Sequence, residues 1–260
     1  MRMSRSTLLA VVTSLALIGP MLHAQQANPT PFQQAVLKAM QGEIRTPEER
    51  ARDINRLPVE ILSFFRMRED MRVIEILPSG GWFTKLLGPV LKDKGKLYVT
   101  HPEGRYADQY RTIAKLPGLE KVEEIGWGAS ASAGGGAFGP SGKWVVQPVD
   151  MVVTFRNYHN FSVADRATVN RSVFDALKTG GYYGLVDHTR RHNEPTTRGN
   201  GRRVDPVLVI KEIQEAGFEL VDFSNLYFRP NDALALEVGD PTLNDRTDRI
   251  ALLFRKTQRR

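Results

Sequence analysis

The sequence predicts an α/β fold: a doubly wound, mostly parallel seven-stranded sheet with an antiparallel edge, preceded by N-terminal helices. From residue 72 onward, short apolar runs alternate with helix-like segments. This alternation is typical of a parallel sheet covered by helices on both faces. The last two runs are close enough in sequence to pair antiparallel. With 41% hydrophobic residues, the 260-residue chain can bury one substantial core.

Residues 25–70 are expected to form a helical extension that lies against the main domain, residues 71–260, as a lid or brace. The segment "TPEER" places Thr46 at a helix N-cap, Pro47 at the first helical position and Glu49 at the third. This is the arrangement of a capping box. A second short helix is expected after Pro58.

Seven strands and four helices are expected in the main domain. The strands are Val73–Leu77, Lys96–Thr100, Val122–Ile125, Asp150–Phe155, Tyr182–Val186, Phe218–Leu226 and Arg249–Arg255. The helices are Trp82–Leu91, Tyr106–Lys115, Val163–Leu177 and Pro206–Ala216, the last two closed by Thr179-Gly180-Gly181 and by Gly217. The glycine-rich stretch between Gly126 and Lys143 is expected to be a mobile loop.

The N-terminus has the layout of a secretory signal peptide, residues 1–24. Arg2 and Arg5 precede the apolar run Leu8–Gly19, and Ala24 offers a small residue for cleavage. We therefore expect a periplasmic or otherwise exported protein with no stable membrane span after cleavage, because the run is short for a span. An uncleaved membrane tether is the alternative.

Composition excludes several classes of chemistry. The chain has no cysteine, which excludes disulfides, a thiol nucleophile and a cysteine-ligated metal. The formal charge is +7, and removal of the two signal-peptide arginines leaves +5. The basic residues are mostly scattered, without a stripe of interleaved aromatics, so nucleic acid is not an expected partner.

Polar residues follow the first two expected strands, where open parallel sheets bind their ligands. Glu75 lies in the first strand, and the corner Pro78-Ser79-Gly80-Gly81 follows it. Adjacent glycines let the backbone approach a ligand, and the helix beginning near Trp82 offers free amides. A plain strand–helix turn is the alternative. After the second strand, His101 or Glu103 can accept a hydrogen bond from a ribose, unless Glu103 is simply a solvated carboxylate.

The four histidines beyond the signal peptide all fall at or just beyond the carboxyl ends of expected strands: His101, His159, His188 and His192. A histidine at such a place can act as a general base near neutral pH. His159, Asp187 and His188 can also form a metal site, or the histidines can simply cap strand ends by hydrogen bonds.

Three further side chains are candidates for the same cleft. Asn157 can hold an amino or carboxylate group of a ligand, and Tyr158 can stack on a flat or cationic group. Trp82 can form a wall of the pocket. Alternatively, each of these aromatic rings packs in the hydrophobic core and does not contact a ligand.

Segments along almost the whole mature length resemble the class I S-adenosylmethionine-dependent methyltransferases. They include "RARDINRLP", "VIEILPSGGWFTKLLGPVLKDKGK", "DMVVTFRNYHNF", "VFDALKTGGYYGLVDH" and "RTDRIALLFRK". More narrowly, the chain resembles a bacterial subgroup of exported or envelope-associated predicted methyltransferases. In that subgroup the corner often contains Pro-Gly-Gly-Gly, so Ser79 replaces the first glycine here.

The resemblance implies a Rossmann-like fold, S-adenosylmethionine as cofactor, and methyl transfer to a small-molecule acceptor. Glu75 and Pro78–Gly81 would hold the methionine part, and His101 or Glu103 the ribose. The residues Asn157, Tyr158 and His159 would line the sulfonium and the acceptor.

His159 is the first choice for the base, and Asp187 or His188 the second. Two alternatives stay open: a non-methylating ligand-binding protein on the same fold, and a metal-dependent enzyme that uses the strand-end histidines.

Overall fold

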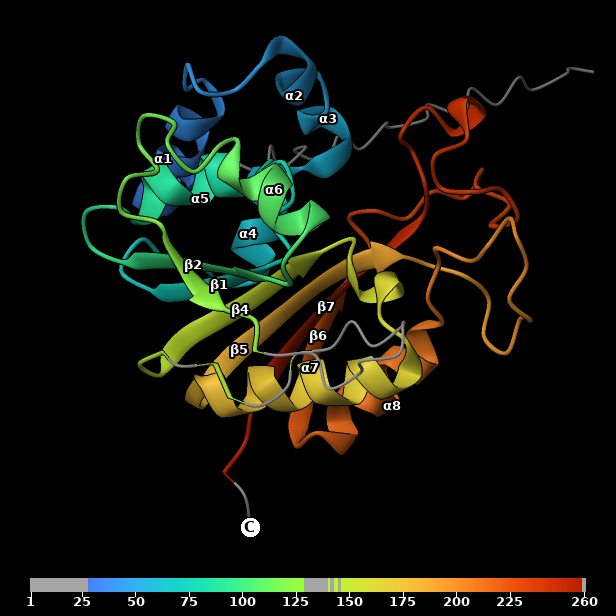
Figure 1. Ribbon diagram of the computed structural model, residues 1–260. Helices are drawn as coiled ribbons and strands as arrows, with labels where there is room; N and C mark the ends of the chain where they lie inside the picture. Colours follow the sequence, from blue (N-terminus) through green and yellow to red (C-terminus); the bar gives the residue numbers. More distant parts are fainter. Residues whose placement is uncertain (1–27, 129–139, 141–142, 145, 259–260) are drawn as a thin grey trace, which may run out of the picture.

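Seven strands form one sheet in the computed structural model of this protein, which describes residues 28–128, 140, 143–144 and 146–258 (Figure 1). The strand order is β3-β2-β1-β4-β5-β7-β6. The strands are β1 (Arg72–Ile76), β2 (Lys96–His101), β3 (Glu123–Gly126), β4 (Val149–Phe155), β5 (Leu177–His188), β6 (Phe218–Ser224) and β7 (Arg249–Lys256). The expected signal peptide and most of the glycine-rich stretch lie outside the described residues.

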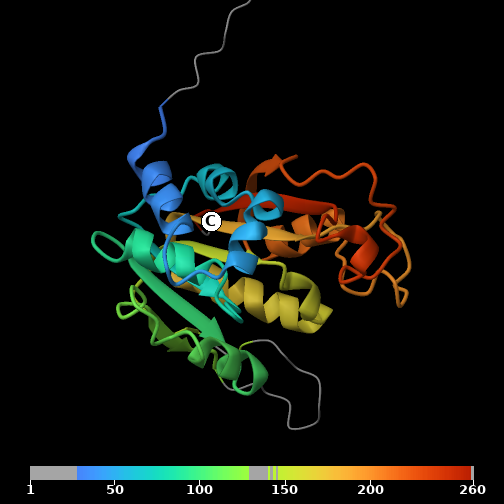
Figure 2. The same cartoon turned by 90° about the horizontal axis from the view of Figure 1, so that it is seen from above.

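Helices cover both faces of the sheet, as predicted. They are α1 (Pro31–Met40), α2 (Pro47–Ala51), α3 (Asp53–Arg56), α4 (Pro58–Phe64), α5 (Thr84–Leu91), α6 (Arg105–Arg111), α7 (Val163–Ala176) and α8 (Pro206–Glu215), with short 3-10 turns η1 (Tyr158–Asn160) and η2 (Pro241–Leu243). The pair α7 and α8 lies on one face, and α1, α4 and α5 lie on the other (Figures 1 and 2). Successive residues of β1 serve opposite faces, because Val73 packs with the N-terminal helices and Ile74 with α7 and α8.

The antiparallel strand lies one place in from the edge. Strands β1 to β5 are parallel, and β7 is antiparallel to both of its neighbours, β5 and β6. The edge strand β6 therefore runs in the same direction as β1 to β5. The predicted α/β sheet with an antiparallel element at its edge is confirmed.

The predicted boundary between α7 and β5 is wrong. The residues Thr179-Gly180-Gly181 were expected to separate a helix from a strand, but they lie inside β5, which begins directly after α7. The pairing between β4 and β5 shifts there, and Gly180 has a φ of 80°. A Cβ at Gly181 would lie 2.9 Å from the carbonyl oxygen of Lys178 and 3.0 Å from that of Asp150. The glycines therefore form an irregularity within the strand rather than a loop.

The N-terminal extension is fastened to the sheet domain by specific hydrogen bonds. The Thr46 hydroxyl accepts from the Glu49 amide, and the Glu49 carboxylate accepts from the Thr46 amide, so the predicted capping box is confirmed. Trp82 Nε1 donates to the Glu49 carbonyl at 3.0 Å, and Tyr227 Oη donates to the Arg56 carbonyl at 2.5 Å. These contacts fix α2 and α3 beside the carboxyl ends of the strands. Within the described part of the chain, no helix has the length and apolar character to cross a membrane.

Candidate functional site

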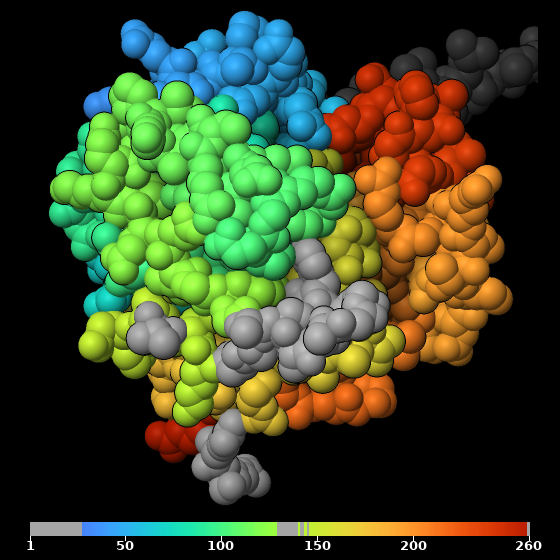
Figure 3. Space-filling view, in the orientation of Figure 1, coloured from blue at the N-terminus to red at the C-terminus, as the bar shows by residue number. Residues whose placement is uncertain are grey.

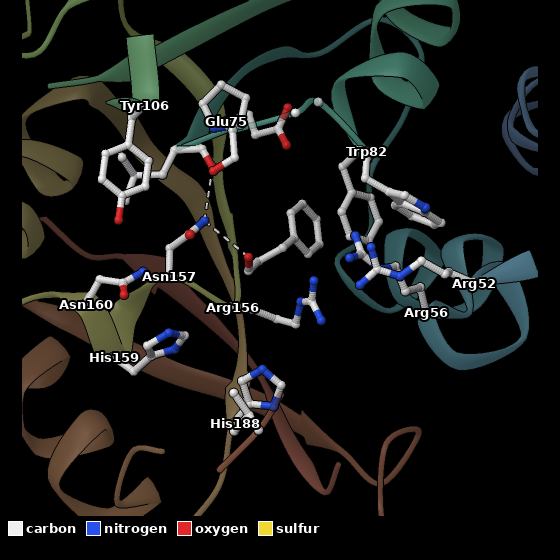
Figure 4. A pocket seen from close by; sticks show the side chains of 18 of the residues that line it. Arg52, Arg56, Glu75, Trp82, Tyr106, Arg156, Asn157, His159, Asn160 and His188 are labelled. Carbon is white, nitrogen blue, oxygen red and sulfur yellow. Dashed lines mark hydrogen bonds between the residues drawn. The ribbon is translucent and has the colours of Figure 1, made fainter. Parts of the chain in front are cut away.

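A cavity of about 540 Å³ opens at the carboxyl ends of β1 and β4 (Figure 4). This is the switch point of the sheet, because the chain goes from β1 outward to β2 and β3 and then returns to β4 on the other side. Its lining comes from the corner after β1, the segment after β4, helices α2, α3 and α6, and the loop before β7. In Figure 3 the N-terminal helices (blue), the segment around α6 (green) and the C-terminal loop (red) meet on this face.

The corner after β1 is built from residues in the left-handed conformation. Leu77, Ser79 and Gly81 have φ values of 54°, 50° and 72°. A left-handed backbone is uncommon for residues other than glycine and is concentrated at functional sites. A Cβ at Gly81 would lie 2.0 Å from Ile113 Cδ1, whereas a Cβ at Gly80 would have no atom within 4 Å. A side chain at Gly81 would therefore need a left-handed backbone and a shift of Ile113, whereas Gly80 leaves open space at the cavity.

Glu75 lies under this corner and is fully buried. Its carboxylate accepts a 2.7 Å hydrogen bond from the Thr84 hydroxyl. Burial raises the pKa of Glu75 to about 7, although the Thr84 hydrogen bond and the charge of Arg56 act in the opposite direction. Glu75 is therefore a weakly charged group at neutral pH.

Asn157 ties the two central strands together. Its amide nitrogen donates to the carbonyl oxygens of Leu77 and Phe155, each at 3.1 Å, and it lines the cavity as well (Figure 4). The neighbouring Tyr158 points away from the cavity. Its hydroxyl donates to Glu212 at 2.8 Å and accepts from Asn170 at 2.9 Å. Its expected role of stacking on a ligand has no support in this placement and stays a prediction.

His159 and Asp187 form a hydrogen-bonded pair. The distance from His159 Nδ1 to Asp187 Oδ1 is 2.7 Å, and Asp187 also accepts from the backbone amides of His159 and His188. Asp187 is fully buried, while His159 lines the cavity. The carboxylate therefore fixes the imidazole ring and leaves Nε2 as the nitrogen without this bond.

His188 also lines the cavity, with its ring centroid 5.8 Å from that of His159. Its Nδ1 lies 2.7 Å from the Thr247 hydroxyl. Burial lowers the pKa of His188 well below its usual range, and the charges of Arg249 and Arg156 add to the effect. His188 is therefore neutral over the physiological pH range.

The residues expected to hold a ribose do not line the cavity. His101 is buried against the ring of Tyr110, with centroids 5.4 Å apart, and its Nδ1 lies 3.3 Å from the Pro102 carbonyl. Glu103 is exposed and pairs with Arg111 at 3.0 Å. Arg105 and Tyr106 of α6 line this side of the cavity instead. The ribose role of His101 or Glu103 stays a prediction.

The strand-end histidines do not converge on one point. His192 is half exposed and lies 3.0 Å from Asp205, the residue that caps α8. Among the described residues, no group of three or more His, Cys, Asp or Glu side chains is placed to hold a metal ion. The described part of the chain therefore offers no set of metal ligands that supports the metal-dependent alternative.

Sequence reasoning missed the arginines of the cavity. Arg52, Arg56 and Arg156 line it (Figure 4). Arg52 and Arg156 lie 3.1 Å and 3.4 Å from the carboxylate of Asp245, and Arg249 lies 3.6 Å from it. Because these four arginines come from three segments that are far apart in sequence, a count of basic runs could not find the cluster. The position of Arg156, directly after a predicted central strand, was the one available signal.

No family model and no curated protein sequence matches the chain. Solved structures do match it. A methyltransferase of Aquifex aeolicus that depends on S-adenosylmethionine is 14% identical, with a TM-score of 0.55, over 85% of this chain and 97% of that chain. The [4+2]-cyclase SpnF is also 14% identical, with a TM-score of 0.56, over 87% and 93% of the two chains. The glycopeptide N-methyltransferase MtfA, solved with sinefungin, is 15% identical, with a TM-score of 0.52, over 78% and 93%.

At these identities the matches define the fold. The chain has the fold of the class I S-adenosylmethionine-dependent methyltransferases. The cyclase match shows that the same architecture also carries a reaction other than methyl transfer. The chemistry of this chain must therefore be argued from its own cavity.

Proposed function

We propose that this protein transfers a methyl group from S-adenosylmethionine to a small-molecule acceptor. The observation that carries the proposal is the left-handed, glycine-containing corner at the switch point of a methyltransferase-type sheet, next to the His159–Asp187 pair. The structural neighbours that depend on S-adenosylmethionine support the same cofactor.

The corner fits the cofactor. The open side of Gly80 is a space that any side chain would fill, and it lets the backbone of the corner approach a ligand. The residues that would hold the methionine part are Glu75 and Pro78–Gly81, and Trp82 would form a wall. When bound, S-adenosylmethionine supplies an electrophilic methyl group to the acceptor.

His159 would take the proton from the acceptor. Asp187 holds the ring through Nδ1 at 2.7 Å, so Nε2 is the nitrogen that can accept a proton. Two backbone amides fix Asp187 in turn. His188 is neutral and buried beside this pair, so it adds no competing positive charge.

Calorimetric titration of residues 25–260 with S-adenosylmethionine and S-adenosylhomocysteine tests the proposal. We expect micromolar affinity for both, and a loss of about tenfold or more in Gly80→Asp, because the new carboxylate occupies the cavity and repels the ligand carboxylate. The melting temperature of Gly80→Asp is the control for folding. If the folded wild-type protein binds neither ligand, the proposal fails.

A second candidate function is a non-methylating reaction or binding role on the same fold. The cyclase match and the absence, among the described residues, of a cavity-lining carboxylate from the end of β2 favour it. This candidate predicts a folded protein without affinity for S-adenosylmethionine.

A further inference from the structure

Arg56 is a buried guanidinium without a counter-ion. The residue is 7% exposed, its guanidinium stacks on the Trp82 ring at 4.5 Å, and its Nε is buried without a hydrogen-bond partner. Among the described residues, none makes a hydrogen bond or an ion pair with the guanidinium, and the Tyr227 hydroxyl reaches only the backbone carbonyl of Arg56. A buried charge without a partner is costly. The side chain lines the cavity (Figure 4), so a ligand is the group that can supply the missing partner.

The carboxylates near Arg56 are already committed or weakly charged. Asp245 is shared by Arg52, Arg156 and Arg249. Glu75 bonds to the Thr84 hydroxyl, and its pKa is raised to about 7. Burial lowers the pKa of Arg56 to about 8, and the charges of Arg156 and Arg52 lower it further in the same direction. A pKa of about 8 still leaves the guanidinium mostly protonated at pH 7, so this corner of the cavity holds excess positive charge.

Arg156 faces the same space from the end of β4. It has a φ of 60°, a strained conformation that its amide holds by donating to the Val186 carbonyl at 2.7 Å. Figure 4 shows Arg56 arriving from the N-terminal helices and Arg156 from the sheet. Two guanidinium groups that converge from different elements can bind a carboxylate or phosphate through several charge-assisted hydrogen bonds.

The location of the arginines assigns the anion to the acceptor. The corner that suits the cofactor follows β1, while Arg156 follows β4 directly before Asn157 and close to His188, whose pKa it lowers. Arg156 therefore lies on the side of the candidate base, and Arg56 faces the same space from its place beside Trp82. We propose that the acceptor is a small molecule with a carboxylate or phosphate group, which Arg56 and Arg156 bind beside the methyl-transfer site. This inference rests on the proposed function.

Calorimetry with inorganic phosphate and with succinate tests this site without knowledge of the acceptor. Each probe is titrated into the free protein and into protein saturated with S-adenosylhomocysteine. We expect at least one anion to bind in both states, and Arg56→Met to weaken it about tenfold or more, because charge-assisted hydrogen bonds are lost. The melting temperature of Arg56→Met should stay unchanged or rise, since the variant removes an unpaired buried charge.

Arg166→Met is the matched control. Arg166 also stacks on an aromatic ring, Tyr158 at 5.0 Å, and also has a buried Nε without a partner, but it pairs with Glu212 and lies outside the cavity lining. Its substitution should leave anion binding within about twofold of wild type, because an arginine outside the cavity makes no contact with the anion.

The outcomes separate the two proposals. Binding of neither anion to the free protein overturns the anion site. Competition between the anion and S-adenosylhomocysteine, with Arg56→Met losing affinity for both, assigns Arg56 to the cofactor carboxylate and overturns the acceptor assignment. Anion binding that depends on Arg56 in a protein that does not bind S-adenosylhomocysteine supports the anion site and overturns methyl transfer alone.

Discussion

Arg203 and Arg56 are both buried arginines, but their surroundings differ completely. The guanidinium of Arg203 forms a two-point ion pair with Asp232 at 3.0 and 3.1 Å and donates to the carbonyl oxygens of Thr189 and Leu236. Arg56 is only slightly more exposed and has only the face of Trp82. Within the residues that the structure describes, the fold thus supplies hydrogen-bond and ion-pair partners for one buried guanidinium and none for the other. This difference is why we assign Arg203 to the architecture and propose Arg56 as part of a binding site.

The largest expected effect is at the satisfied arginine. Arg203→Met should lower the free energy of unfolding by about 3–5 kcal/mol, because it leaves the Asp232 carboxylate buried without its partner. Arg202→Met is the control. Arg202 is half exposed and pairs with Glu237, so its loss should cost less than about 1 kcal/mol. Urea unfolding of both variants measures the difference, and equal losses would remove the contrast between an architectural arginine and a surface one.

The two adjacent glycines of the corner show the same contrast between a residue that serves the fold and a residue that borders the cavity. Gly81→Ala should lower the free energy of unfolding by about 2–4 kcal/mol, because it combines a left-handed backbone with a clash against Ile113. Gly80→Ala should change it by less than about 1 kcal/mol, since its Cβ meets no atom. Chemical denaturation of both variants tests this division. A Gly80→Ala loss as large as that of Gly81→Ala would mean that Gly80 also serves the fold.

Glu75 tests whether Arg56 has an internal counter-ion. Burial raises the pKa of Glu75 to about 7, so the folded protein binds more protons than the unfolded chain between about pH 4.5 and pH 7. Stability should therefore fall as the pH rises through this window. Glu75→Gln removes that fall and should be more stable than wild type by up to about 3 kcal/mol at pH 7.5, with little difference at pH 4.5.

Urea unfolding of wild type and Glu75→Gln at several pH values checks this sign. If Glu75 were the counter-ion of Arg56, the amide would lower stability at pH 7.5, and Arg56 would need no external anion. The same curves therefore decide between an internal and an external partner.

The features that depend on residues close together in the chain could be predicted from the sequence. The capping box at Thr46, the seven strands and the corner after β1 are each encoded by neighbouring residues, and local patterns predicted them. The bulge in β5 was misread because a helix-ending glycine pair and a strand irregularity look alike in one sequence.

The site was only partly predictable for a different reason. The segment containing His159 was predicted at the end of its strand, but whether a side chain at a strand end faces the cavity depends on its packing. Tyr158 is next to His159 and points away from the cavity toward Glu212. The arginine cluster was invisible because it depends on three segments of the chain meeting in space.

The bond between Arg52 and Asp245 closes the cavity wall with two residues 193 positions apart in the chain. A contact of such long range must await the docking of both ends of the chain, and closing a long loop early carries an entropic cost. In folding terms, the sheet can assemble from its sequential pairs while this wall is still open. A ligand held between the N-terminal helices and the sheet binds only after this wall has closed. Its binding therefore stabilises the closed state relative to the open one by mass action.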